Sequence, residues 1–165
     1  MTINQDGLWV QPGQGALFSV VSDLVTFKAV GEDTGGKYAL FEFVVQPQTG
    51  PPLHIHSRED EAFYIQEGEF EFQLGDRTLV ATAGTFIHSP KGQLHGFKNI
   101  GIIPGKMLCW ATPAGIEKFF AEVGQRVEDP RAPLPPVSSA IIERMLATAP
   151  KYGLNIIPPA TDSSK

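Results

Sequence analysis

The sequence is short of the residues that crosslink or anchor a chain. Cys109 is the single cysteine among its 165 residues, so an intramolecular disulfide and a zinc site built from several thiolates are both excluded. No run of about 18 apolar residues, the length of a membrane-spanning helix, is found. The N-terminal residues lack the basic segment and apolar core of a secretory signal. We therefore expect a cytoplasmic protein with no membrane partner.

Positive charge is scarce as well. The chain has 13 Lys+Arg against 18 Asp+Glu, which gives a net charge of −5. Nucleic-acid binding relies on a basic face that neutralises phosphates, and a polybasic membrane anchor needs clustered positive charge. The composition therefore argues against both kinds of partner. The hydrophobic content of 42%, with 11 Phe, indicates one folded domain rather than a disordered chain.

Short aromatic and β-branched segments fill residues 1–112. Turn-forming pairs such as Gly35-Gly36, Gly75-Asp76 and Pro104-Gly105 separate these segments. We predict strands within 16–31, 37–46, 61–66, 69–74, 78–83, 85–90 and 106–113. Closely spaced strands without helical patterns between them are typical of an antiparallel sandwich or barrel, so the predicted fold class is all-β.

The pattern changes to helical after Trp110. Thr112 and Pro113 predict the N-cap and first residue of a helix that ends at Gly124. Its apolar face comprises Ile116, Phe119, Phe120 and Val123. A second amphipathic helix is predicted over 138–149, with Ile141, Ile142, Met145, Leu146 and Ala149 on one stripe. We expect residues 113–160 to form a short C-terminal α-helical extension that covers the barrel, and residues 161–165 to form a disordered tail.

Histidine is rare and clustered, since the four histidines all lie between residues 54 and 95. His54 and His56 are two residues apart, so in an extended strand their side chains project to the same face. Glu61 is in phase with buried aromatic residues, where a carboxylate is costly unless it is paired or bound to a metal. His95 follows a Pro-Gly turn about forty residues later.

Three imidazoles and one carboxylate suit a first-row transition metal. The predicted ligands are His54, His56, Glu61 and His95. An H-x-H pair also occurs on exposed strands, so the pair alone does not establish a metal site. We place His88 at the rim or surface, because it lies next to the Ser89-Pro90 turn.

The spacing of these residues with glycines and prolines resembles the two motifs of the cupin superfamily. The first motif is matched by His54, His56, Glu61 and Gly68. The second motif is matched by Gly84, Pro90, Gly92, His95 and Asn99. The resemblance implies a jelly-roll β-barrel, also called a double-stranded β-helix, with the metal inside. It implies one divalent transition metal per chain, namely Fe, Mn, Ni, Co, Cu or Zn.

A narrower resemblance involves residues 50–72, 112–124 and 151–159. These segments are similar to single-domain bacterial cupins that include flavonol dioxygenases of the quercetin 2,3-dioxygenase type. The similarity implies cleavage of a flavonol-like or other enolisable aromatic substrate with O₂. It also implies that Glu61 acts as the catalytic base that takes the proton of the substrate hydroxyl.

The barrel interior is expected to stack on the aromatic substrate and exclude water. Core packing is the favoured alternative role for each of the candidate pocket residues, which are Phe41, Phe43, Phe63, Phe70, Phe72, Phe86, Phe97 and Trp110. Tyr64 is predicted on the outer face, and Cys109 is predicted to be a small buried side chain.

Two other functions stay open at this point. The same scaffold supports a metal-dependent isomerase, epimerase or lyase acting on a small polar substrate, and it supports a non-catalytic module that binds a small molecule. Only Arg58, Lys91 and Lys98 lie near the motifs, which argues modestly against a phosphorylated substrate. We also expect a homodimer, because an open jelly roll leaves strand edges that need a partner.

Overall fold

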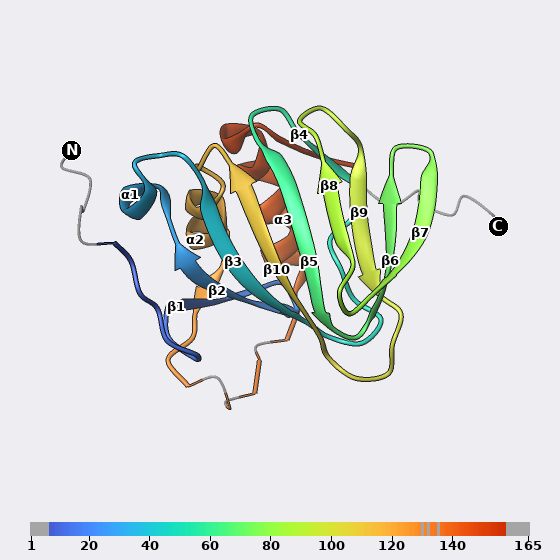
Figure 1. Ribbon diagram of the computed structural model, residues 1–165, viewed down its shortest axis with the longest axis horizontal. Coiled ribbons are helices and arrows are strands. Elements are labelled where there is room, and N and C mark those ends of the chain that lie inside the picture. Colours follow the sequence, from blue (N-terminus) through green and yellow to red (C-terminus); the bar gives the residue numbers. More distant parts are fainter. Residues whose placement is uncertain (1–6, 130, 132, 135, 158–165) are drawn as a thin grey trace.

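The computed structural model describes residues 7–129, 131, 133–134 and 136–157, and it contains two antiparallel sheets (Figure 1). The larger sheet runs in the order β11 (Gln125–Arg126), β1 (Ala16–Val20), β2 (Asp23–Ala29), β3 (Ala39–Val45), β10 (Gly105–Thr112), β5 (Asp60–Glu67) and β8 (Phe86–Ser89). The smaller sheet runs in the order β12 (Leu154–Ile156), β4 (His54–His56), β9 (His95–Asn99), β6 (Glu69–Leu74) and β7 (Arg77–Thr82). The predicted all-β fold is confirmed.

An aromatic core joins the two sheets, because alternate residues of each strand point inward. Phe72 on β6 lies opposite Phe97 on β9, within the smaller sheet. The ring of Phe63, on β5 of the larger sheet, has its centroid 5.3 Å from that of Phe72 and 5.7 Å from that of Phe97. All three side chains are buried, so their contacts between sheets stabilise the barrel.

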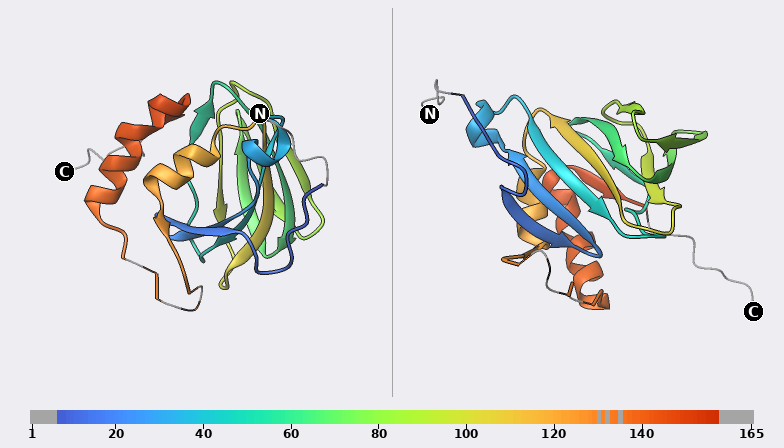
Figure 2. Two further views of the ribbon diagram at one scale, coloured as in Figure 1. Left: turned by 90° about the vertical axis from the view of Figure 1, so that its left-hand side faces the viewer. Right: turned by 60° about the horizontal axis from the view of Figure 1, so that its bottom comes forward.

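Helices α2 (Glu117–Val123) and α3 (Ser139–Thr148) lie side by side against the barrel (Figure 2). The first helix was predicted to begin at Pro113, but it begins at Glu117. The Glu117 carboxylate accepts hydrogen bonds from the backbone N–H groups of Gly115 (2.6 Å) and Gly31 (3.0 Å), which fixes the preceding residues as a loop. The predicted apolar face of this helix is confirmed by the burial of Ile116, Phe119 and Val123.

The second helix begins where it was predicted to begin, but only part of its predicted apolar stripe is buried. Ser138 is its N-cap, with the side chain accepting from the N–H of Ile141. Met145 and Ala149 are buried, but Ile142 and Leu146 are 39% and 37% exposed. Only part of the apolar stripe therefore packs against the rest of the described chain.

Several short elements were not predicted. They are α1 (Gly31–Thr34), β11, the 3₁₀ helix η1 (Ala149–Tyr152) and β12. β11 pairs with β1, and β12 pairs with β4, so the segment predicted as a helical extension also supplies two strands to the barrel sheets. The predicted tail at 161–165 lies outside the described residues. Within the described ranges, no helix has the length and apolar character needed to cross a membrane.

Candidate metal centre

The structure brings the four predicted ligand residues together. β4 carries His54 and His56 on one face, β5 carries Glu61, and β9 carries His95 directly opposite His54. One ligand atom from each of the four lies within 4.8 Å of the others. All four side chains are buried. Strand alternation, which turns residues 54 and 56 the same way, is the local cause of this arrangement.

Each histidine engages an acceptor outside the cluster through Nδ1. The Nδ1 of His54 lies 2.8 Å from the carbonyl of Pro52, and that of His95 lies 3.1 Å from the carbonyl of Gln93. A carbonyl only accepts, so these Nδ1 atoms carry a proton, and the Nε2 atoms are on the side of each ring away from these carbonyls. The Nδ1 of His56 lies 3.3 Å from the carboxylate of Glu59. Outer partners of this kind orient metal-binding imidazoles, so the donor set fits a divalent transition metal.

The Nε2 atoms and Glu61 face one another. The Glu61 Oε2 lies 2.9 Å from the Nε2 of His95 and 3.3 Å from the Nε2 of His56. Burial alone would raise the pKa of Glu61, but the His56 and His95 rings hold it well below its usual range. Glu61 is therefore an ionised carboxylate, which is the form that binds a cation.

The histidine pKa values move in opposite directions. Burial, helped by the neighbouring His95 and His56 rings, lowers the pKa of His54 to about 3. Burial also opposes charging of His56, but the carboxylates of Glu61 and Glu59 outweigh it and raise its pKa to about 10. His54 is therefore neutral at physiological pH, as a metal ligand must be. His56 holds its proton there and would have to release it when a metal binds.

Glu59 is a buried residue that the sequence did not single out. The change Glu59→Gln keeps its size but removes the charge that orients the His56 ring. We expect zinc affinity to fall about 10–100-fold while one binding site is retained. Isothermal titration with Zn²⁺ measures this, with Glu69→Gln on the exposed face of β6 as the matched control. Unchanged affinity in Glu59→Gln would show that its contact with His56 does not orient the ring.

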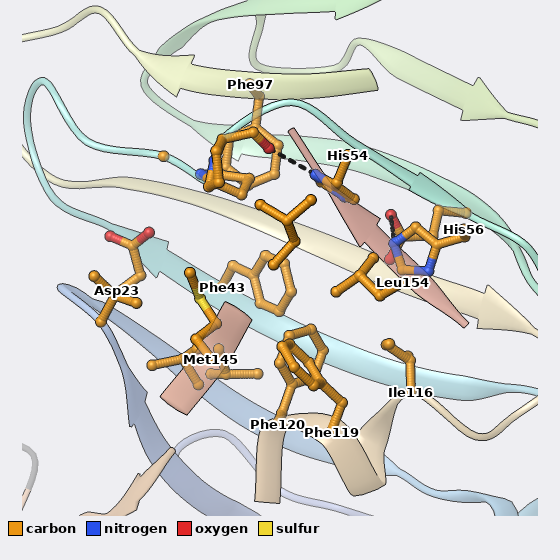
Figure 3. A pocket seen from close by; sticks show the side chains of 18 of the residues that line it. Asp23, Phe43, His54, His56, Phe97, Ile116, Phe119, Phe120, Met145 and Leu154 are labelled. Carbon is orange, nitrogen blue, oxygen red and sulfur yellow. Dashed lines mark hydrogen bonds and ion pairs between the residues drawn. The ribbon is translucent and has the colours of Figure 1, made fainter. Parts of the chain in front are cut away.

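A cavity of about 320 Å³ lies beside the cluster (Figure 3). His54, His56 and Glu61 contribute to its wall, while most of the remaining wall is apolar. Apolar side chains come from both sheets and both helices, including Phe43, Phe97, Phe119, Phe120, Met145 and Leu154. The volume is within the range of small-molecule sites, about 300–1,000 Å³.

Three of the eight predicted pocket aromatics line this cavity, namely Phe43, Phe63 and Phe97. Three others are fully buried in the adjacent core and are not among the described lining residues, namely Phe41, Phe70 and Phe72. The pocket wall formed by the helices was missed. The helical period indicated that Ile116, Phe119 and Phe120 face the barrel, but it could not indicate a hollow behind them.

The prediction that Phe86 and Trp110 lie inside the barrel was wrong. β8 turns Ile87 and Ser89 inward, so Phe86 is 57% exposed. β10 turns Cys109 inward, so its neighbour Trp110 also faces outward. The centroids of the Phe86 and Trp110 rings lie 5.9 Å apart on the outer face.

Other placements agree with prediction. Tyr64 and His88 are exposed, whereas Cys109 is fully buried. The Sγ of Cys109 lies 3.8 Å from Oε1 of Glu61. Burial, together with the nearby Glu61 charge, raises the pKa of this thiol well above its usual range. Cys109 is therefore an uncharged packing residue beside the cluster.

A second carboxyl also lines the cavity. Asp23 is the first residue of β2, and burial raises its pKa from 3.8 to about 6, against the hydrogen bonds it accepts from Gln46 and Thr49. Because the folded state holds this proton more tightly than the unfolded state, the protonated group favours folding below about pH 4. That contribution is lost as the pH rises through about 6.

Asp23→Asn is therefore expected to stabilise the protein near neutral pH. The difference in pKa corresponds to at most about 3 kcal/mol in the free energy of unfolding. The variant is expected to exceed the wild type by up to that amount at pH 7.5 and to match it near pH 4. Urea denaturation at both pH values measures the difference. A variant that is no more stable than the wild type at pH 7.5 would contradict the assignment.

Comparison with known proteins identifies the barrel. Residues 41–111, which include all four cluster residues, match the family described as "Cupin domain". The chain therefore contains a cupin domain. The RmlC-like cupin from Shewanella frigidimarina NCIMB 400 superposes with a TM-score of 0.59 at 17% identity, over 67% of this chain and 94% of that one. That likeness is one of fold.

Two curated relatives share sequence with part of this chain. Mannose-1-phosphate guanylyltransferase 2 of Escherichia coli O157:H7 is 33% identical over 72 residues, which is 44% of this chain and 15% of the relative. The uncharacterized protein MJ1618 of Methanocaldococcus jannaschii is 33% identical over 79 residues, which is 48% of this chain and 63% of the relative. The chain therefore spans less than two thirds of the length of either relative.

Proposed function

We propose that this cupin is a metal-dependent dioxygenase that cleaves a flavonol-like or other enolisable aromatic substrate with O₂. The observation that carries the proposal is the position of the His/Glu cluster in the wall of an otherwise largely apolar cavity. Aromatic walls favour a flat aromatic body, and the cluster offers the polar group that fixes its orientation. When bound by the cluster, a divalent transition metal would supply the acidity of the substrate hydroxyl and the reactivity toward O₂.

Glu61 is proposed as the base that takes the substrate hydroxyl proton. Its carboxylate lines the cavity and is ionised, so it has a free site for the proton of a hydroxyl placed beside it. Its lowered pKa makes it a weak base, so the proposal requires a substrate hydroxyl that a bound metal would make more acidic. The rings of His56 and His95, both within 3.3 Å of Oε2, hold the carboxylate in place. The apolar walls, including Phe43 and Phe97, keep water from competing for the same proton.

The cavity wall favours this proposal over a polar substrate. The described residues that line the cavity include no lysine or arginine, and Arg58, Lys91 and Lys98 are not among them. A phosphate or a sugar acid would therefore lack a lysine or arginine partner there. This composition disfavours the isomerase, epimerase or lyase alternative.

Anaerobic addition of quercetin or 3-hydroxyflavone tests the proposed activity. The protein is loaded in turn with Fe, Mn, Co, Ni and Cu. With at least one metal, we expect a shift of the flavonol absorption band, followed by O₂ uptake once air is admitted. A shift without O₂ uptake would favour the non-catalytic binding module, and no shift with any metal would contradict both. The homodimer and the cytoplasmic location stay predictions.

A further inference from the structure

We propose that Asp23 is a second recognition point of the cavity, where its carboxylate accepts a hydrogen bond from a hydroxyl group on the far end of the substrate. The proposal deepens the dioxygenase assignment and rests on it for the group bound at the His/Glu cluster. It narrows the substrate class to flat aromatic molecules with an enolisable oxygen at one end and a phenolic hydroxyl at the other.

The position of Asp23 is the first argument. It lines the same cavity as His54 and His56. Figure 3 shows Asp23 and His56 at opposite ends of the cavity, with Phe43 and Phe120 between them. A ligand that spans the apolar part would therefore place one polar group at each end.

The hydrogen bonds of Asp23 leave one oxygen available. Oδ1 accepts from the backbone N–H of Gln46 at 3.1 Å and lies 2.9 Å from the hydroxyl of Thr49. No described residue donates a hydrogen bond to Oδ2 or forms an ion pair with this carboxylate. Asp23 is half-buried, so its Oδ2 can accept a hydrogen bond either from water or from a ligand donor in the cavity.

The number of available acceptors distinguishes a hydroxyl from an ammonium group. A hydroxyl has one proton to donate, which matches the one available oxygen of Asp23. An ammonium group has three donors, and besides Asp23 the one hydroxyl among the described lining residues is that of Ser22, so a donor would be left without a side-chain acceptor. The geometry therefore favours a neutral hydroxyl over an amine.

Asp23 could act merely as a structural tether for the loop that begins at Gln46, and one substitution separates the two roles. In Asp23→Asn the amide oxygen keeps both contacts to Gln46 and Thr49, so the tether is preserved. The amide nitrogen then replaces Oδ2 and is a donor in place of an acceptor. A purely structural role predicts unchanged ligand preference in this variant.

The test compares two probes of similar size, 4-phenylphenol and 4-methoxybiphenyl, of which only the first can donate a hydrogen bond. Calorimetric titration uses the zinc-loaded wild type, Asp23→Asn and the control Asp76→Asn, whose carboxyl lies on an exposed turn. We expect the preference of the wild type and of the control for 4-phenylphenol to be at least about fivefold larger than that of Asp23→Asn. Any contact with zinc is common to the three proteins and cancels when their preferences are compared.

Three results would overturn the inference. They are equal affinity of the wild type for the two probes, no binding of either probe, or a preference that Asp23→Asn retains. Tighter binding of 4-phenylbenzylamine than of 4-phenylphenol would also overturn it, in favour of an amine. Because neither biphenyl probe carries a flavonol's chelating oxygens, a failed flavonol experiment combined with a confirmed phenol preference would reject the dioxygenase and keep the role of Asp23.

Discussion

Replacing His54 with alanine is expected to abolish the stabilisation of the protein by added metal. A metal that binds only the folded state at 1,000 times its dissociation constant stabilises that state by about 4 kcal/mol. His54 supplies one of four clustered ligand atoms, and the three that remain offer a smaller and less complete site. Thermal unfolding with added Co²⁺ or Zn²⁺, and again with a chelator, measures the effect.

The exposed His88 provides the matched control for this experiment. His88→Ala removes an imidazole of the same kind from the outer face of β8, away from the cluster. We expect His88→Ala to keep the full rise in melting temperature on metal addition and His54→Ala to show almost none. An equal metal response in the two variants would mean that the stabilising metal binds elsewhere.

Glu61→Gln is expected to lower turnover by about 10²–10⁴-fold, the range that proton transfer by a positioned side chain contributes. The glutamine amide cannot take up a proton near neutral pH, although its oxygen keeps the shape of the site. His54, His56 and His95 remain, so part of the metal is retained. Initial rates of O₂ uptake with a saturating flavonol, normalised to bound metal, measure the loss.

A change of charge alone is controlled by Glu69→Gln on the exposed surface. That variant is expected to turn over at the wild-type rate. If Glu61→Gln keeps the wild-type rate per bound metal, Glu61 is not the base, and its role is limited to holding the metal.

The strands and the ligand cluster were predictable because they depend on local alternation. An H-x-H segment turns both imidazoles to one face wherever it is extended, and Glu61 followed the phase of Phe63. The pairing of β4 with β9, which sets His95 beside His54, is a long-range contact. We predicted that contact from the similarity of the motif spacing to that of cupins. Strand alternation alone could not have predicted it.

The wrong placement of Phe86 and Trp110 has a simple physical cause. Phe86 and Ile87 are adjacent apolar residues, so either phase of β8 buries one of them, and a shift by one residue exchanges the faces. Tertiary pairing decides the phase, because Ser89 lies opposite Glu61 on β5 and faces inward with it. Trp110 lies between Cys109 and Ala111, which are also apolar. The sequence of β10 is therefore compatible with either set of alternate residues facing inward.

The short elements and the second carboxyl could not be predicted for a different reason. β12 has three residues, too few for a reliable pattern, and it exists as a strand because it pairs with β4. Asp23 acquires its raised pKa from burial in a wall that the helices help to build. Its chemistry therefore depends on contacts between segments more than 90 residues apart along the chain.

The central claim is that His54, His56, Glu61 and His95 hold one divalent transition metal at the end of the cavity. Anomalous diffraction at the cobalt edge, from a crystal of the cobalt-loaded protein, tests it most directly. We predict a single peak per chain, about 2.0–2.2 Å from the Nε2 atoms of the three histidines and from one oxygen of Glu61. No peak at this cluster, or a peak held by other residues, would contradict it.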